Sequence, residues 1–168
     1  RVLPRVRGAF SLVVLDENRV IGVRDPHGFR PLVLGRLPLP GADAPGLWGD
    51  DTGGWILASE TAALDIVSAE FVRDVEPGEI VVLEPGREPM SVRYAEATPA
   101  LCVFELIYFA RPDSYMEGRN LYEARRRMGM QLAAEHPAAA DLVMPVPDTG
   151  APSAAGFAEA SGIPYREG

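Results

Sequence analysis

The chain has 168 residues, and 47% of them are hydrophobic, which is enough apolar content to bury a sizeable core. Its formal net charge of -8 disfavours sequence-independent binding to nucleic acid, and the lack of lysine excludes a lysine nucleophile or a phosphate-loop lysine within the chain. No apolar stretch approaches a membrane span, and the single cysteine, Cys102, permits no internal disulfide. We therefore expect a cytoplasmic protein that binds neither membrane nor nucleic acid.

The first 97 residues have the pattern of a β meander with one helix. Short runs of branched and aromatic residues alternate with turn residues, which is typical of antiparallel strands. A helix is predicted at 60–68, with Ser59 as its N-cap and an apolar face that covers the sheet. That face consists of Ala63, Leu64 and Val67. Strands are predicted at 10–15, 20–24, 32–34, 55–59 and 80–83.

Two connecting segments in this region are rich in turn-forming residues. Residues 24–32 (RDPHGFRPL) contain Arg, Asp and His, but their spacing predicts a tight turn rather than a catalytic motif. We expect Gly28 to adopt a left-handed backbone conformation and Arg24 to pair with Asp25 or a nearby carboxylate. Residues 38–54, rich in Pro, Gly and Asp, show no periodic pattern, so we predict a mobile surface loop.

A change of composition near residues 94–100 marks a boundary, because the apolar run at 101–110 begins a region of α/β character. A helix follows, for which Asn120 is the expected N-cap and Glu123 the expected partner in a capping box. Its apolar residues recur at helical spacing, at Leu121, Ala124, Met128 and Leu132. Residues 125–127 are consecutive arginines and predict a solvated helix face; the alternative is that one of them binds an acidic neighbour or a nucleotide.

Residues 141–146 (DLVMPV) form a short apolar run of the kind buried on both faces of a parallel sheet. Residues 147–150 (PDTG) then end the strand, Pro152 suits the first turn of a helix, and Gly162 ends that helix. Free N–H groups and the positive end of the helix dipole should therefore gather at 148–150, at the carboxyl edge of a strand. This pattern predicts a phosphate site, and a plain packing turn is the alternative.

Six segments carry a resemblance to one enzyme family. Residues 108–114 (YFARPDS), 122–129 (YEARRRMG) and 145–150 (PVPDTG) resemble the start of the phosphoribosyltransferase domain of glutamine phosphoribosylpyrophosphate amidotransferases, or amidophosphoribosyltransferases. Upstream segments resemble the later part of the glutaminase domain of the same enzymes. They are 8–36, 56–67 and 71–84.

The resemblance covers nearly the whole chain, in the family's order, and implies a fold of mixed α/β and α+β class. Residues 1–97 would be the later part of an N-terminal-nucleophile glutaminase domain, a β meander with a covering helix. Residues 98–168 would be the start of a type I phosphoribosyltransferase α/β domain.

The function implied by the resemblance is the formation of 5-phosphoribosylamine from glutamine and phosphoribosyl pyrophosphate, the first committed step of purine (IMP) synthesis. Magnesium, regulation by purine nucleotides and a homo-oligomer are implied with it. The family's catalytic cysteine and glutamine-binding residues would precede Arg1, and its main phosphoribosyl loop would follow Gly168. No catalytic residue is therefore assigned, and we expect no turnover from this chain alone.

Four positions match functional residues of the family. Asp148, Thr149 and Gly150 would bind the phosphoribosyl substrate, with the Thr149 hydroxyl at the magnesium ion. The alternative for Thr149 is a helix cap for the segment beginning at Pro152. Tyr108 would lie between the two active sites and help to relay nucleotide binding to the glutaminase half; from its pattern alone it is an aromatic residue in an apolar run.

Cys102 stands where some family members have a ligand of an iron–sulfur cluster, whose other three cysteines lie near the carboxyl end. One cysteine cannot hold a 4Fe-4S cluster, and the alternative is a small buried hydrophobic residue.

Two other functions stay open. Another N-terminal-nucleophile amidotransferase, such as an asparagine synthetase, shares the Arg-Asp-Pro and Ala-Ser-Glu segments but should lack PVPDTG. A noncatalytic nucleotide-binding or regulatory module of the same ancestry is the second alternative.

Overall fold

The structure is a computed structural model, and it describes residues 2–38 and 53–167. The chain separates into two compact units, Arg1–Cys102 (unit 1) and Val103–Gly168 (unit 2). The loop predicted at 38–54 lies, apart from its ends, outside the described residues. Within the described ranges, no helix has the length and apolar character needed to cross a membrane.

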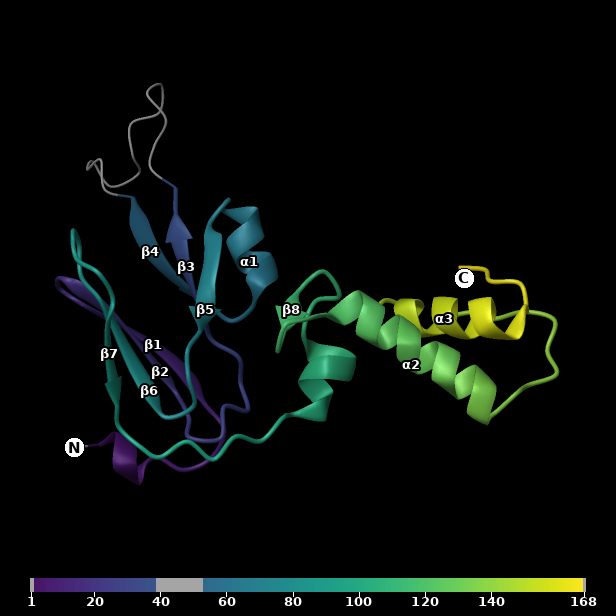
Figure 1. Cartoon of the computed structure of the whole chain (residues 1–168), viewed down its shortest axis with the longest axis horizontal. Helices are drawn as coiled ribbons and strands as arrows, with labels where there is room; N and C mark the ends of the chain where they lie inside the picture. Colours follow the sequence, from purple (N-terminus) through teal and green to yellow (C-terminus); the bar gives the residue numbers. More distant parts are fainter. Residues whose placement is uncertain (1, 39–52, 168) are drawn as a thin grey trace, which may run out of the picture. The chain divides into compact units, whose positions relative to one another are not determined.

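Unit 1 is built on two antiparallel sheets, with strand orders β1-β2-β6-β7 and β4-β3-β5 (Figure 1). A short 3-10 turn, Leu3–Arg5, precedes the first strand. In the hairpin of β1 and β2, Asp16 pairs with Arg19, so the two residues between them form the tight turn. The strands are β1 (Ser11–Asp16), β2 (Arg19–Arg24), β3 (Val33–Leu37), β4 (Gly54–Ala58), β5 (Glu70–Asp74), β6 (Glu79–Leu83) and β7 (Met90–Arg93).

A strand is present at each of the five predicted places, whereas β5 and β7 were not predicted. Both are the last strands of their sheets, and they expose most of their side chains. A strand that is not buried on one face does not need alternating apolar residues, so its sequence carries a weak signal.

Unit 1 has three layers. Between the two sheets, Leu34 of β3 lies in one apolar cluster with Val81 of β6. The neighbouring residue of β3, Val33, points to the opposite face of the sheet, where it packs with Leu64 of α1 (Thr61–Ile66). The prediction that the helix covers the sheet is therefore confirmed.

The start of α1 differs from the prediction. Its N-cap is Glu60, not Ser59, and no side chain caps it. Of the predicted apolar face, Leu64 is buried, but Val67 is 45% exposed. The helix has only 6 residues and Val67 is already its C-cap, so Val67 does not lie in the turn that packs on the sheet.

Asp25 organises the turn that follows β2. Its side chain is fully buried, and its two carboxylate oxygens accept backbone N–H groups of the turn and of the residue before β1. Oδ1 accepts from His27 at 2.9 Å and Gly28 at 3.1 Å, and Oδ2 accepts from Phe10 at 3.3 Å. Gly28 has φ +64°, which confirms the predicted left-handed turn.

Arg24 lies beside Asp25 in sequence, but its guanidinium donates to three backbone carbonyls. They belong to Gly28 (2.9 Å), Arg30 (3.1 Å) and Val75 (2.7 Å). The expected pairing of Arg24 with a carboxylate is therefore wrong: the arginine satisfies buried carbonyls, and the aspartate satisfies buried N–H groups.

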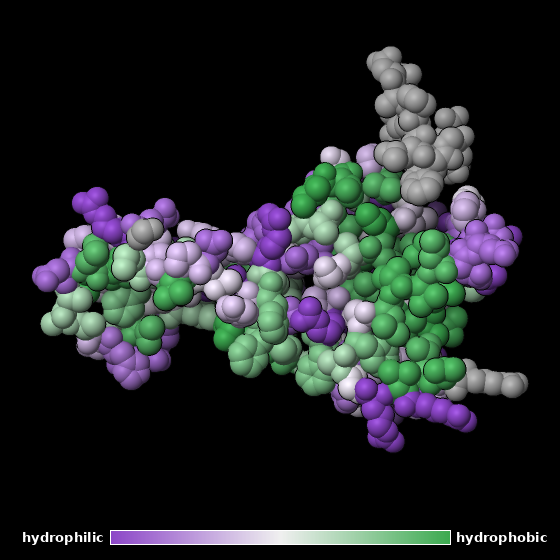
Figure 2. All heavy atoms as spheres, turned by 180° about the vertical axis from the view of Figure 1, so that it is seen from behind, coloured by the Kyte–Doolittle hydropathy of each residue, from purple (hydrophilic) through white to green (hydrophobic). Residues whose placement is uncertain are grey.

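The β1 strand carries unusually exposed apolar residues. Leu12, Val13, Val14 and Leu15 are all exposed, although they form one continuous apolar run. Figure 2 shows hydrophobic side chains gathered on this side of unit 1. Among the described residues, β1 pairs with β2 alone, so its other edge presents unpaired backbone groups.

Unit 2 is built around two helices, α2 (Leu121–Glu135) and α3 (Ala151–Ser161), which lie side by side (Figure 1). A π-helical turn, Glu105–Phe109, and a small hairpin of β8 (Tyr115–Met116) and β9 (Arg119–Asn120) precede α2. The helices touch through their backbones. A Cβ atom at Gly129 would collide with the carbonyl oxygen of Ser153, and one at Gly156 with that of Arg126.

The N-cap of α2 is confirmed, because the Asn120 side chain accepts the N–H of Glu123 at 3.1 Å. The predicted apolar face is wrong for Met128 and Leu132, which are 38% and 49% exposed, whereas Ala124 is half-buried. The buried residues are instead spaced four apart, at Leu121, Arg125, Gly129 and Ala133. Contact with α3 selects this face because Gly129 permits the closest approach.

The strand predicted at 141–146 does not form. Val143 makes one parallel bridge to Tyr165, donating to Pro164 O at 2.9 Å and accepting from Arg166 N–H at 3.0 Å. The other apolar residues of the run are exposed, up to 81% at Val146. With one short neighbouring segment on one side only, the run lacks the ladder that a buried parallel strand requires.

Candidate functional site

The turn at 147–150 joins the Val143 bridge to the N-terminus of α3. The peptide bond between Pro147 and Asp148 is cis. Gly150 is the N-cap of α3, and its N–H donates to Val146 O at 3.2 Å. The next N–H, of Ala151, donates to Asp148 O at 3.2 Å. These two bonds fold the backbone tightly over residues 146–151.

Two of the three N–H groups expected to be free are available. Within residues 53–167, the N–H groups of Asp148 and Thr149 donate to no protein acceptor, and the Thr149 hydroxyl makes no hydrogen bond. The N–H of Gly150 is not free, because it closes the turn on Val146. Thr149 is half-buried and Asp148 is exposed, so both can be reached from solvent.

The alternative role of Thr149 as a helix cap is not observed. The N-cap position belongs to Gly150, and no side chain makes a capping hydrogen bond to α3. The threonine hydroxyl thus lies at the start of a helix of 11 residues without a structural hydrogen bond of its own.

The charges at the turn suit an anion that arrives with a cation. The helix dipole places partial positive charge at the start of α3, and the first turn of α3 contains no acidic residue. The carboxylate of Asp148 adds negative charge just before it. In the described part of the chain, no group of three or more His, Cys, Asp or Glu residues could hold a metal ion. Magnesium usually keeps several water ligands and shares phosphate oxygens with its substrate, so it does not require a cage of protein side chains.

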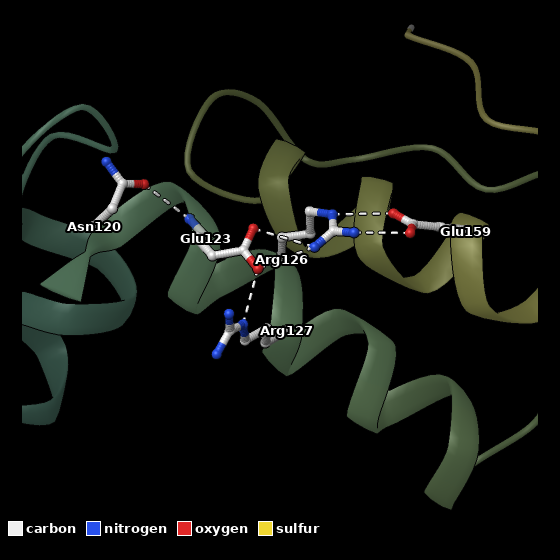
Figure 3. A network of polar contacts seen from close by, with 5 residues as sticks. All are labelled: Asn120, Glu123, Arg126, Arg127 and Glu159. Carbon is white, nitrogen blue, oxygen red and sulfur yellow. Dashed lines mark hydrogen bonds and ion pairs between the residues drawn. The ribbon is translucent and has the colours of Figure 1, made fainter.

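The exposed side of α2 carries an ion-pair network that reaches α3 (Figure 3). Glu123 binds Arg126 at 3.1 Å and Arg127 at 2.8 Å, and Arg126 binds Glu159 of α3 at 2.7 Å. The hydrogen bond from Arg127 is the largest influence that lowers the pKa of Glu123, and the hydrogen bond to Glu159 raises the pKa of Arg126. The carboxylate of Glu123 thus faces the two arginines, and no bond from it to the Asn120 backbone completes the capping box.

Arg125 differs from its two neighbours. It is only 1% exposed, so the prediction of a solvated face is wrong for this residue. Its Nε donates to Leu106 O at 2.8 Å and its Nη2 to Ala110 O at 2.7 Å. Burial lowers the pKa of the guanidinium. The sequence did contain a signal for this burial, because Arg125 lies four residues after Leu121 and four before Gly129.

Tyr108 lies on the π-helical turn and is 58% exposed, with its ring in an edge-to-face contact with Phe109 at 5.6 Å. Cys102 is a free, half-exposed thiol at the end of unit 1, so it is not the fully buried residue of the alternative interpretation. The structure places Asp148, Thr149 and Gly150 on one turn, whereas Tyr108 lies on a separate element of unit 2.

Solved structures of known proteins identify the class of fold to which the chain belongs. No protein-family model matches the chain. Solved structures do match, among them one described as the allosteric regulatory enzyme of purine biosynthesis and one described as glutamine phosphoribosylpyrophosphate amidotransferase from B. subtilis complexed with ADP and GMP. Their TM-scores are 0.85 and 0.83, and both are 38% identical to this chain, covering 99% of it and 33% of the solved chain. The mixed α/β fold is therefore that of phosphoribosylpyrophosphate amidotransferases, as expected.

The curated relatives are named amidophosphoribosyltransferase. That of Mycobacterium tuberculosis is 50% identical over 167 residues, which are 99% of this chain and 29% of the relative. That of Synechocystis sp. is 53% identical over 163 residues, which are 96% of this chain and 30% of the relative. The chain is thus homologous to one segment of the amidophosphoribosyltransferases and spans about 30% of their length. The resemblance expected from the sequence is confirmed.

Proposed function

We propose that this segment serves an amidophosphoribosyltransferase that forms 5-phosphoribosylamine from glutamine and phosphoribosyl pyrophosphate. In this proposal, unit 1 belongs to the glutaminase domain and unit 2 to the phosphoribosyltransferase domain. The observation that supports it is the turn at 147–150, where two N–H groups and a hydroxyl at a helix N-terminus bond to no described residue. The chain that carries this turn is 50% identical to the matching segment of one such enzyme.

The chemistry assigns simple roles to the turn. Ammonia attacks the anomeric carbon of the ribose, a C–N bond forms, and the bond to pyrophosphate breaks, so negative charge develops on the departing oxygens. The N–H groups of Asp148 and Thr149 would donate to those oxygens, and the dipole of α3 would stabilise the charge. Magnesium would neutralise the diphosphate when bound, and the Thr149 hydroxyl fits as one of its oxygen contacts.

Regulation by purine nucleotides, a homo-oligomeric assembly and a cytoplasmic location are part of the same proposal. A relative solved with ADP and GMP supports the nucleotide part. An iron–sulfur cluster does not fit the residues of this chain, because Cys102 is its only cysteine and such a cluster takes four thiolates. Cys102 would supply one ligand at most.

Thr149→Ala tests the binding role. In calorimetry with magnesium and phosphoribosyl pyrophosphate, we expect weak binding by the wild-type chain and roughly tenfold weaker binding by the variant, the loss of one charge-assisted contact. Ser161→Ala removes a hydroxyl from the opposite end of α3 and should bind like the wild type. Identical binding by all three chains would remove the assignment of Thr149.

The coding sequence around this segment tests the wider proposal. We expect an upstream methionine-cysteine start and a downstream Val-Asp-Asp-Ser stretch in the same reading frame. A reading frame without either extension would favour the noncatalytic nucleotide-binding module.

A further inference from the structure

Arg125 of α2 holds the π-helical turn Glu105–Phe109 through two side-chain hydrogen bonds. The turn is closed by a bond from Ala110 N–H to Glu105 O at 3.2 Å, five residues apart. The guanidinium then reaches the carbonyls of Leu106 and Ala110 with two different nitrogen atoms, at 2.8 and 2.7 Å. One planar group thus fixes two carbonyls four residues apart, near both ends of the turn.

Burying the charged guanidinium of Arg125 is energetically unfavourable, which suggests that the residue is needed to hold the backbone in place. Among the described residues, Arg125 makes no ion pair, and its Nη1 has no hydrogen-bond partner. A buried cation without a counterion is unfavourable, and a hydrophobic side chain could fill the same volume. What a hydrophobic side chain cannot do is hold two carbonyls in a fixed direction.

The backbone of the same residue is held by α3. The Ser153 hydroxyl donates to Arg125 O at 3.1 Å. The close approach at Gly129 and Gly156 prevents the two helices from sliding past each other without moving this contact. Since α3 begins directly after the turn at 147–150 and Ser153 lies near its start, a displacement of that turn would reach the Arg125 backbone through this hydrogen bond.

The π-helical turn that Arg125 holds carries an exposed aromatic side chain. Tyr108 projects from the π-helical turn, and its ring contacts Phe109 at 5.6 Å, which in turn lies 6.3 Å from Phe104. A small rotation of the turn would change the direction in which the rings of Phe104, Tyr108 and Phe109 point. Because Arg125 holds the carbonyls of Leu106 and Ala110 on either side of Tyr108, it would limit the directions in which the Tyr108 ring can point.

We propose that Arg125 is a positioning residue that couples the turn at 147–150, through α3 and α2, to the orientation of Tyr108. This inference rests on the proposed function, because it takes that turn to be the place where a phosphoribosyl ligand acts. The coupling runs through a continuous series of contacts: Ser153 hydroxyl, Arg125 backbone, Arg125 guanidinium and the two carbonyls of the π-helical turn.

The first experiment needs no ligand. Backbone amide hydrogen exchange is measured in the full chain for the wild type, Arg125→Lys and Arg127→Lys. Lysine cannot span both carbonyls, so exchange at residues 105–111 should become about tenfold faster in Arg125→Lys while the centres of α2 and α3 keep their protection. Arg127, whose side chain is 74% exposed, is the matched control and should change nothing at 105–111. Equal exchange in all three chains, or faster exchange spread evenly over unit 2, would overturn the positioning role.

The second experiment measures coupling. The chain is labelled with fluorotyrosine, the Tyr108 signal is assigned with Tyr108→Phe, and magnesium phosphoribosyl pyrophosphate is added. We expect the ligand to shift the Tyr108 signal in the wild type, and to bind Arg125→Lys within about twofold of the wild-type affinity without shifting that signal. Ser153→Ala, which removes only one hydroxyl, is the variant to use if Arg125→Lys does not fold, and it should reduce the shift. A shift of the Tyr108 signal that is undiminished in a folded variant would overturn the coupling. If the wild-type chain binds no ligand, the proposed function is contradicted, and the hydrogen-exchange experiment alone decides the role of Arg125.

Discussion

Unit 1 is stabilised by apolar side chains packed between layers, whereas unit 2 is stabilised by the contact of two helix backbones and by polar groups. One cluster in unit 1 alone buries Leu32, Leu34, Val75, Val81 and Leu83. In the described part of unit 2, the buried hydrophobic residues are Ala110, Leu121, Ala133 and Ala158. Alanine removes little apolar area from water, so unit 2 depends more on individual polar and backbone contacts and should unfold at the lower denaturant concentration.

Both units nevertheless use a buried arginine in the same way. Arg24 connects three carbonyls around the turn after β2, and Arg125 connects two carbonyls of the π-helical turn. Neither is paired with a carboxylate of a described residue. The comparison indicates that, in this chain, a buried arginine fixes irregular backbone that no sheet or helix satisfies.

The largest expected effect concerns the polar centre of unit 1. Asp25→Ala leaves the N–H groups of Phe10 and His27 without their acceptor and Gly28 with the Asp25 carbonyl alone, which should lower the free energy of unfolding of unit 1 by roughly 4 kcal/mol. Urea unfolding followed by tryptophan fluorescence measures this, because Trp55 packs against the apolar cluster of unit 1 and residues 103–168 contain no tryptophan. Asp16→Ala, at a side chain that is 56% exposed, is the control. Equal stability of the two variants would contradict the role of Asp25.

The next effect should be confined to unit 2. Gly129→Ala places a methyl group against Ser153 O, so the helices must separate, at a cost of roughly 3 kcal/mol. Helix circular dichroism should show the loss while tryptophan fluorescence still reports an intact unit 1. Gln131→Ala, at an exposed position of the same helix, should leave both signals unchanged. A change in the fluorescence transition would show that the units do not unfold separately.

Glu79 should make the stability of unit 1 depend on pH. Burial tends to raise the pKa of Glu79, but hydrogen bonds from Arg73, Ser91 and the N–H of Glu76 outweigh it and lower the pKa below the ordinary value of 4.5. The folded state thus favours the charged form, so the stabilisation is present above pH 4.5 and is lost as the pH falls through the lower folded pKa.

Replacing Glu79 by Gln should therefore cost roughly 2 kcal/mol at neutral pH, and less as the pH is lowered. Denaturant unfolding at several pH values between neutral and acidic measures the difference between the two proteins. Glu84→Gln, directly after the same strand but with a more exposed side chain, is the control. A difference that does not shrink in acid would contradict the role of the ionised carboxylate.

The smallest expected change in stability concerns the helix cap of α2 in unit 2. Asn120→Ala removes the cap of α2 and should lower the stability of unit 2 by about 1 kcal/mol. Asn120→Ser keeps a capping oxygen and should recover most of the loss. Thermal unfolding followed by circular dichroism compares the three proteins, and equal midpoints for alanine and serine would show that the cap contributes nothing.

The elements predicted correctly from the sequence are those that neighbouring residues determine. Asn120 has the chemistry of a cap, and Gly28 lies in a turn that needs a left-handed residue, so both were found from neighbouring residues alone. The turn at 147–150 and the helix after it were found for the same reason. The elements that failed depend on distant partners: residues 141–146 are not a strand because they have one short neighbour, and Arg125 is buried because the π-helical turn lies against α2.

The site was predictable to the same extent. Thr149 and Asp148 were correctly expected to offer unbonded groups at the start of a helix. That Gly150 uses its N–H internally depends on how closely the turn folds back on Val146, which no local pattern encodes. Tyr108 could be placed on an apolar run, but its link to α3 through a buried arginine required the three-dimensional structure.

The apolar strand β1 has a practical consequence for anyone who handles this chain. A solvent-facing strand with no lysine or proline between Leu12 and Leu15 is a template onto which further strands can add. Concentrated samples should accordingly become turbid in a concentration-dependent manner. Spectroscopy and calorimetry then belong at the dilute end of their working range, and a charged replacement at Val13 would be a reasonable way to extend that range.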